Sequence, residues 1–212
     1  MYLPPHFAET RPEALRDLMH QHGLATLITL ASEGLTANHI PLEYDPVPAP
    51  WGTLRGHVAR ANPVWHDFSA EVGALAVFQG PQAYITPSWY PSKAATGRVV
   101  PTYNYLVVHA HGSLHVIDDP AWVRAFVTRL TERYESERPR PWAVSDAPSD
   151  FIDQQLRAIV GIEIPITKLV GKWKNSQNRP SADQVGVAQG LLASRDPSAT
   201  VLADWIERDL AR

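Results

Sequence analysis

Cysteine is absent from the sequence, and methionine occurs only twice. Without cysteine the chain forms no disulfide, no iron–sulfur cluster, no thiolate nucleophile and no zinc site built on cysteine. Long apolar runs are also missing, because the stretch 24–30 is far shorter than the ~20 residues of a membrane-spanning helix. Residues 1–11 lack the basic and apolar segments of a secretory signal. We therefore expect a protein of the cytoplasm that uses no thiol chemistry and binds no membrane.

An excess of positive charge is missing as well. The sequence holds 19 Lys and Arg against 22 Asp and Glu, a formal net charge of −3. This balance does not provide the basic field that draws proteins to nucleic acids, and no predicted helix carries the clustered Arg and Lys of a recognition helix. The Gly-x-Gly-x-x-Gly and Walker A phosphate motifs are also absent. We expect no direct sequence-specific DNA binding, and any bound phosphate must be held by other residues.

The 212 residues have the composition of a globular protein, with 44% hydrophobic and 19% charged residues. Short runs rich in Val, Ile, Thr and aromatic residues predict strands at about 24–30, 35–44, 53–58, 73–79, 82–86, 102–117 and 159–168. Capping signals and helical periodicity predict helices at about 10–23, 119–137, 150–158, 180–193 and 197–210, with a short helix after Asn62. This order predicts an α+β fold with a barrel or sandwich of strands, forming one domain over residues 1–212.

The richest candidate site is a basic segment near the C-terminus, Gly171–Arg179. It lies in a stretch, 164–182, that contains four Lys and Arg residues and no acid. Lys172 and Lys174 are interleaved with Trp173 and followed by amide and hydroxyl side chains, among them Ser176, Gln177 and Asn178. Such donors suit a phosphate or the pyrimidine edge of a flavin, and an indole can stack on a planar ring. The alternative is a solvated basic turn that binds nothing.

A second candidate is the long connection from Pro87 to Tyr105, which joins two apolar strands. It carries four aromatic residues together with Lys93 and Arg98. Long connections with such side chains often act as functional lids. The same aromatic residues would equally suit a dimer interface or a cap on the barrel, and the sequence leaves both interpretations open.

The stretch Leu54–Pro63 is a third candidate. It predicts a strand that ends in a short helix, with His57, Arg60 and Asn62 grouped at the junction. A strand end, a helix N-terminus and an arginine together suit an anion. Asn62 equally suits the role of an N-cap for a helix that begins at Pro63, and the two roles are compatible.

Three histidines, His109, His111 and His115, follow one another at intervals that place them on one face of a single predicted strand. A His-x-His pair on a strand occurs in the metal sites of cupins, and a metal-dependent enzyme built on His109 and His111 is the alternative function. The nearest acids, Asp118 and Asp119, lie in the following turn, so the ligand set is incomplete. We therefore expect no metal at these histidines.

Five motifs in the same order closely resemble the PaiB family of FMN-binding proteins, and the resemblance covers nearly the whole chain. These motifs are Met1–Phe7, Gly56–Pro63, Pro87–Tyr90, Val99–Tyr105 with His109–Gly112, and Gly171–Arg179. The sequence departs from the family at two positions, with Tyr103 where the family usually has Trp and Asn175 where it usually has Leu. The change at position 103 weakens the transfer of any aromatic stacking role, whereas neither change removes a charged or donor group.

The resemblance implies a split β-barrel like that of pyridoxamine phosphate oxidase, with flanking and C-terminal helices. It also implies a homodimer that holds FMN between its subunits, either as a flavin-dependent redox protein such as an FMN-dependent oxidoreductase or as a flavin-responsive regulator. The family is commonly labelled as negative transcriptional regulators, which is a genetic label and not a mechanism. No substrate and no obligatory acid or base follow from the sequence, because a flavin itself carries out the redox chemistry.

Overall fold

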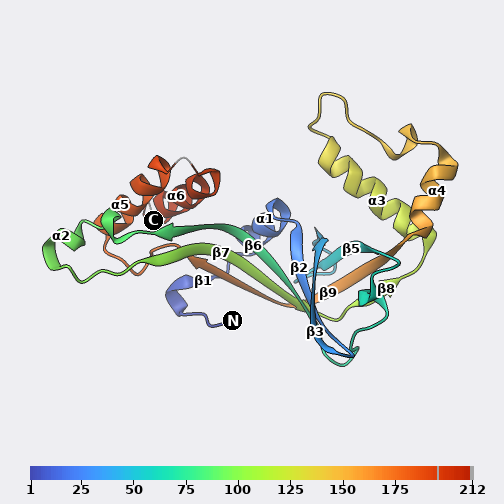
Figure 1. Cartoon of the computed structure of the whole chain (residues 1–212), viewed down its shortest axis with the longest axis horizontal. Helices are drawn as coiled ribbons and strands as arrows, with labels where there is room; N and C mark the ends of the chain where they lie inside the picture. The colour runs from blue at the N-terminus through green and yellow to red at the C-terminus, as the bar shows by residue number, and fades with distance from the viewer. Residues whose placement is uncertain (195, 211–212) are drawn as a thin grey trace. The chain divides into compact units, whose positions relative to one another are not determined.

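The computed structural model describes residues 1–194 and 196–210 (Figure 1). Its strands are β1 (Ala8–Glu9), β2 (Leu24–Ala31), β3 (Gly34–Pro41), β4 (Glu43–Asp45), β5 (Thr53–Ala59), β6 (Ala74–Ile85), β7 (Thr102–Gly112), β8 (His115–Ile117) and β9 (Ile159–Lys174). Its α-helices are α1 (Pro12–Gln21), α2 (Ser92–Thr96), α3 (Pro120–Glu135), α4 (Ser149–Arg157), α5 (Ser181–Ala193) and α6 (Pro197–Leu210). Short 3-10 helices are η1 (Pro5–Phe7), η2 (Pro63–Trp65), η3 (Pro87–Trp89) and η4 (Val144–Asp146). The α+β class expected from the sequence is confirmed.

The strands form one sheet whose order is β3-β2-β6-β7-β9-β5-β4, and β1 and β8 add to β9 outside this path. The pairs β2–β3, β4–β5 and β5–β9 are antiparallel. Strand β9 pairs with four other strands, namely β1, β5, β7 and β8.

The chain divides into two compact units. The C-terminal unit consists of residues 1–18, 79–108 and those from 170 onward, and the central unit consists of residues 19–78 and 109–169. Strands β6, β7 and β9 each contribute residues to both units. The expectation of a single domain over residues 1–212 therefore stays a prediction.

Each unit has its own buried apolar side chains. Those of the central unit include Leu27, Leu54, Phe78, Phe126 and Ile162, and those of the C-terminal unit include Ile85, Leu106, Leu191, Leu202 and Ile206, all fully buried. Helices α3 and α4 pack in the central unit, and α5 and α6 pack on each other in the C-terminal unit (Figure 1).

Two helices begin at the caps that the sequence indicates. Asp119 accepts a hydrogen bond from the backbone N of Ala121 at 2.9 Å, and α3 then begins at Pro120. Asn62 caps the short helix η2 in the same way, accepting from the backbone N of Val64 at 3.0 Å.

Four strand predictions need correction. The expected strand 35–44 is two strands, since β3 ends at Pro41 and β4 begins at Glu43. The expected break at Gly80–Pro81 is wrong, because β6 runs without interruption from Ala74 to Ile85. The expected strand 102–117 is two strands, since β7 ends at Gly112 and β8 begins at His115. Strand β9 continues six residues beyond the expected end at Lys168. The lysines of the basic segment consequently lie on a strand, and only the residues after Lys174 form a turn.

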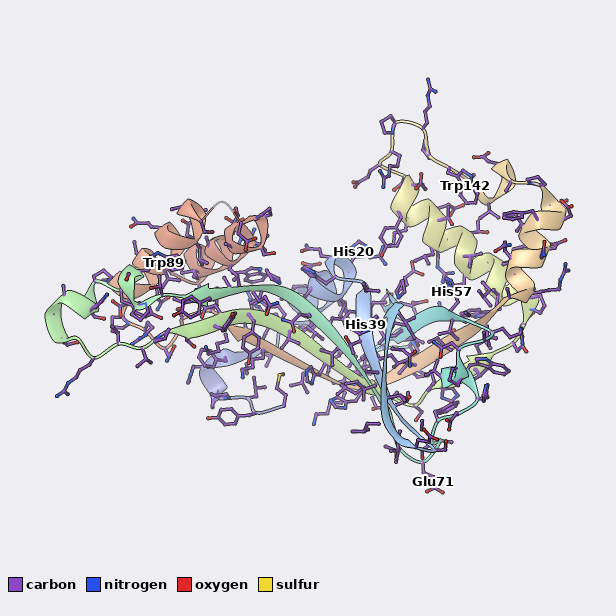
Figure 2. The ribbon with its side chains drawn as sticks, viewed as in Figure 1. His20, His39, His57, Glu71, Trp89 and Trp142 are labelled. Carbon is purple, nitrogen blue, oxygen red and sulfur yellow. The ribbon has the colours of Figure 1, made fainter. Side chains whose placement is uncertain are left out.

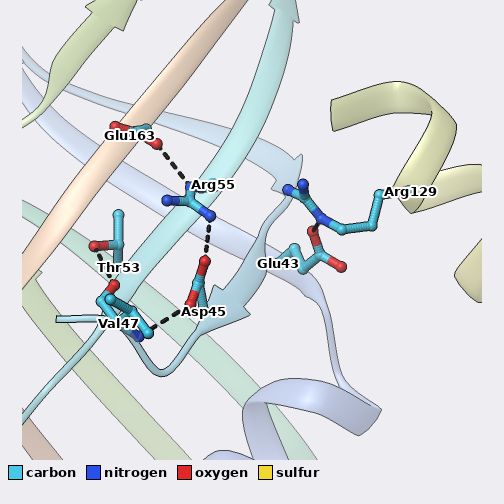
Figure 3. A network of polar contacts seen from close by, with 7 residues as sticks. All are labelled: Glu43, Asp45, Val47, Thr53, Arg55, Arg129 and Glu163. Carbon is cyan, nitrogen blue, oxygen red and sulfur yellow. Dashed lines mark hydrogen bonds and ion pairs between the residues drawn. The ribbon is translucent and has the colours of Figure 1, made fainter. Parts of the chain in front are cut away.

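Ion pairs connect the strands and helices of the central unit (Figure 3). Arg55 on β5 lies between two acids, with its Nε donating to Glu163 Oε1 at 2.7 Å and its Nη1 pairing with Asp45. Arg129 of α3 donates from Nε to Glu43 Oε2 at 2.9 Å. Because Glu43 and Glu163 are the cross-strand neighbours of Arg55, these charges reinforce the register of β4, β5 and β9. Across the described residues, no helix combines the length and apolar character that crossing a bilayer requires.

Candidate functional site

The basic segment lies in the C-terminal unit, at the end of β9 and in the turn that follows. Lys172 is 7% exposed, and its Nζ donates to the backbone oxygen of Tyr2 at 3.1 Å. The ammonium also lies 5.7 Å from the ring centroid of Tyr2 and 5.3 Å from that of Tyr105. Among the described residues no carboxylate pairs with Lys172. Carbonyl and aromatic groups therefore solvate this charge without neutralising it.

Lys174 is half-buried and likewise has no acidic partner in the described part of the chain. Its Nζ donates to Thr102 Oγ1 and to the backbone oxygen of Tyr103, both on β7. Burial, and then the positive charge of Lys172, lower the pKa of Lys174. Two ammonium groups thus repel each other in a partly buried place, and an anion bound there would stabilise both.

The turn after Lys174 contains buried amide groups without hydrogen-bond partners. Asn104 of β7 donates from Nδ2 to Ser176 Oγ at 2.9 Å, but its buried Oδ1 has no hydrogen-bond partner within the described part of the chain. Asn175 is 1% exposed, and neither its Oδ1 nor its Nδ2 has a partner among the described residues. Ser176 adopts φ 68°, a left-handed conformation that is uncommon outside glycine. Orphaned buried amides are costly, so this strained turn lacks a polar partner that can both donate and accept.

The other residues predicted in the basic segment have different environments. Gln177 braces the turn, since its Oε1 accepts from the backbone N of Asn175 at 2.7 Å and its Nε2 donates to the oxygen of Trp173 at 2.7 Å. Asn178 is exposed. Trp173 is 2% exposed and meets the ring of Trp205 edge to face, with centroids 5.9 Å apart. An indole covered in this way has no open face on which a planar ring could stack in the described structure.

The segment that carries Lys93 is docked on α5 of the same unit. Lys93 Nζ donates to Ser88 Oγ at 3.3 Å, and both residues line an open groove of about 760 Å³ together with Gln189. Trp89 lies against α5 where that helix has Gly186 and Gly190 (Figure 2). A Cβ on Gly190 would sit 2.2 Å from Trp89 Cδ2, so only glycine allows this approach. The expected lid is therefore a short helical segment held on α5.

His57, Arg60 and Asn62 belong to the central unit. His57 on β5 packs edge to face with Phe126 of α3, with centroids 5.8 Å apart, and its buried Nδ1 has no partner among the described residues. Burial lowers the pKa of His57. At a given pH a larger fraction of this ring is therefore neutral than of a solvent-exposed histidine.

Arg60 and Asn62 already have partners within the central unit. The guanidinium of Arg60 binds both carboxylate oxygens of Asp118, at 2.9 and 2.6 Å, and donates from Nε to the oxygen of Arg157 at 2.9 Å. Asn62 caps η2 and donates from Nδ2 to Asn38 Oδ1 at 2.8 Å. These bonds hold both side chains in place within the central unit.

The histidine cluster differs from the expected arrangement. His115 is the first residue of β8 and is not on the strand that carries His109 and His111. The rings of His109 and His111 have centroids 6.4 Å apart and are tilted by 57°. Within residues 1–194 and 196–210, no three His, Asp or Glu side chains are grouped as a metal site requires. The metal-dependent alternative gains no support from these ligands.

Sequence reasoning missed three residues that shape the C-terminal unit. Asn104 contributes an orphaned amide, Tyr2 covers Lys172, and Asp183 holds the segment that contains Lys93. Each acts on a residue more than 70 positions away. No spacing motif marks such pairs, because only the tertiary fold brings them together.

Comparison with known proteins decides the family. Residues 1–168 match the family model described as "Putative FMN-binding domain". The chain is also 30% identical to the Protease synthase and sporulation protein PAI 2 of Bacillus subtilis, over all of this chain and 99% of that protein. The chain belongs to this FMN-binding family. The PaiB resemblance drawn from the sequence is thereby confirmed, and FMN is the cofactor.

Other relatives extend the comparison. An uncharacterized protein of Aspergillus fumigatus is 33% identical over 90% of each chain. The FAD and heme binding protein of Mycobacterium smegmatis has a TM-score of 0.55 at 16% identity, covering 79% of this chain and 73% of that one. The flavocytochrome Anf3 of Azotobacter vinelandii has a TM-score of 0.54 at 13% identity, covering 79% of this chain and 69% of that one. The expected split β-barrel is thereby confirmed as the fold.

The residues of the basic segment fit FMN on chemical grounds. A phosphate dianion matches the two lysines that have no acidic partner in the described structure. The orphaned oxygens and nitrogen of Asn104 and Asn175 match the alternating donors and acceptors of a flavin ring edge and ribityl chain, directly or through water.

Proposed function

We propose that the protein is an FMN-binding homodimer of the cytoplasm that acts as a flavin-dependent redox protein or a flavin-responsive regulator. The observation that supports it most is the pair of lysines, Lys172 and Lys174, that lie without an acid beside orphaned amides. Bound FMN would supply the electron transfer. Both roles require the same FMN-loaded protein, so one binding experiment tests their common basis.

In this proposal Lys172 and Lys174 hold the FMN phosphate, and Ser176 with the neighbouring amides orients the rest of the ligand. Lys172 exchanges the oxygen of Tyr2 for a phosphate oxygen, which moves the N-terminal residues away from it. An anion at this place raises the lowered pKa of Lys174 again, because opposite charge stabilises the ammonium form. Lys93, Gln177, Asn178, His57, Arg60 and Asn62 stay proposed contributors, with Arg60 keeping its pair with Asp118.

The test is a fluorescence titration with FMN and with riboflavin, which lacks the phosphate. Charge-assisted hydrogen bonds to the phosphate should make FMN bind at least about tenfold more tightly than riboflavin. Lys174→Gln should remove most of that difference and leave riboflavin binding unchanged. Lys168→Gln is the matched control, since Lys168 is an exposed lysine on the same strand. Equal affinities of the unaltered protein for the two flavins would refute the phosphate assignment.

The homodimer is supported by exposed aromatic residues on β6 and β7. Tyr84 and Tyr103 meet edge to face with centroids 5.8 Å apart, yet each is about half exposed in the single chain. Val100 nearby in sequence is also exposed. Exposed aromatic pairs of this kind are typical of protein interfaces. Light scattering at micromolar concentration should give a molar mass near twice the 23.5 kDa of one chain, and Tyr103→Glu should lower it.

A further inference from the structure

A groove of about 660 Å³ lies entirely within the central unit, beside the start of α3 and the end of α4. Val123, Leu156 and Ile159 contribute apolar surface to it. Its volume falls in the range of small-molecule sites, about 300–1,000 Å³. Of the residues that line the groove, only Arg60 is among the proposed FMN contacts, and the basic segment contributes none.

Two ion pairs border the groove. Arg60 pairs with Asp118 through two hydrogen bonds, and Arg124 pairs with Asp153. All four residues line the groove. Each arginine thus has its charge matched by one aspartate, so these pairs frame the apolar surface and add no net charge.

Arg157 is the third arginine of the groove, and its positive charge is not matched by an aspartate there. It is exposed, lines the groove, and has no ion pair among the described residues. Its backbone oxygen accepts from Arg60 Nε at 2.9 Å, which fixes its main chain at the border of the groove. The lining charges are therefore three arginines against two aspartates, a surplus of one positive charge next to an apolar surface.

We propose that this groove binds an amphipathic carboxylate with an apolar tail of medium length. The carboxylate pairs with the guanidinium of Arg157, whose planar fork suits two parallel hydrogen bonds. The tail lies against Leu156, Ile159 and Val123 and is removed from water there. A neutral ligand would leave the arginine unmatched, and a dianion would exceed the single surplus charge.

The probes are decanoate and 1-decanol, titrated calorimetrically into the FMN-loaded protein and into the FMN-free protein. Decanoate should bind once per chain in both forms. Arg157→Gln should weaken decanoate binding at least about tenfold and leave 1-decanol binding unchanged, because only the charged head contacts the guanidinium. Leu156→Ser should weaken the binding of both probes. Arg140→Gln, which alters an exposed arginine outside the groove, should change neither.

Several outcomes would overturn the proposal. These are non-saturable decanoate binding, equal decanoate affinity of Arg157→Gln and the unaltered protein, and displacement of decanoate by FMN, which would make the groove part of the flavin site. A loss of the dimer in Leu156→Ser would identify the groove as a subunit interface and would also overturn it. Failure of FMN to bind the basic segment would leave the decanoate result unaffected, so the two proposals are tested separately.

Discussion

The carboxylate of Asp183 accepts two hydrogen bonds from Ser92, one from the backbone N at 3.0 Å and one from Oγ at 2.7 Å. Ser92 is the first residue of α2, and Asp183 lies in the first turn of α5. Only 1% of Asp183 is exposed. This one acid therefore fixes the segment that carries Lys93 to a helix that follows it by 91 residues.

Asp183→Asn should destabilise the protein. The asparagine keeps one oxygen but turns an amide donor toward the two donors of Ser92, so at least one buried hydrogen bond to a charged group is lost. Such a loss costs about 1–3 kcal/mol in the free energy of unfolding, measured by urea denaturation. Asp17→Asn, at an exposed position of the same unit, is the control and should have little effect. Equal stability of the two variants would show that the Ser92 contact contributes nothing.

The effect of Gly190→Ala on the free energy of unfolding should have opposite signs in the presence and in the absence of the Trp89 side chain. In a helix alanine is normally favoured over glycine by about 1 kcal/mol. Here the added Cβ would sit 2.2 Å from Trp89 Cδ2, and such overpacking costs about 1–3 kcal/mol. The substitution should therefore destabilise the unaltered protein and stabilise Trp89→Ala, as measured by urea denaturation in both backgrounds. The same effect in both backgrounds would contradict the packing of Trp89 on α5.

The stability of the protein should fall as the pH decreases from about 7.5 to about 5. Burial lowers the pKa of His57 below its unfolded value of about 6.5, so the unfolded chain binds more protons in this range. The contribution of His57 to stability is complete above the unfolded pKa and is lost as the pH falls toward the folded pKa. His57→Gln should therefore flatten the pH dependence of the unfolding free energy.

Burial also lowers the pKa of His22, His109 and His111, so His57→Gln should remove only part of the pH dependence. His20→Gln provides the matched control, because His20 is exposed. If His57→Gln retained the full slope of the unaltered protein between about pH 7.5 and 5, the buried ring would not be the cause.

The FMN-loaded protein should not bind duplex DNA with sequence specificity. Specific binding draws much of its affinity from clustered Lys and Arg, and the proposed function commits Lys172 and Lys174 to the flavin phosphate. A mobility-shift assay at about 150 mM salt should leave promoter and random fragments equally unshifted. Nanomolar affinity for one promoter fragment alone would contradict this prediction.

Most of the secondary structure could be predicted from local signals, and the errors have physical causes. The Gly80–Pro81 pair predicts a break, but the pairing of β2 with β6 covers only Leu75 to Val77. Beyond Val77 that side of β6 has no partner among the described strands, and an edge strand tolerates a proline. The extension of β9 contains Gly171, where a Cβ would lie 2.2 Å from Leu15 Cδ2 of α1 and 2.9 Å from the backbone oxygen of Glu9 on β1. The extended strand is therefore packed by elements from the start of the chain. Neither effect can be read from a window of a few residues.

The sequence predicted which charged residues of the candidate site lack an acidic partner better than it predicted what each residue contacts. Lys172 and Lys174 are unneutralised among the described residues, as the acid-free stretch indicates. Trp173 was expected to stack on a planar ring, but it is buried against Trp205. Arg60 was expected to face an anion, but in the structure its charge is paired with Asp118. Composition reveals which charges lack a neighbour in the sequence, but it cannot show which partners the fold supplies.

The position of β9 in the sheet has a consequence for how the chain folds during synthesis. Four strands pair with β9, yet its residues, 159–174, come late in the sequence. A nascent chain that ends before them has β1, β5, β7 and β8 already made but without their common neighbour. Contacts of such long sequence separation form slowly and leave strand edges exposed in the meantime. Translation must therefore reach the last quarter of the chain before the sheet can be completed, and a truncation at residue 158 should yield an aggregating product.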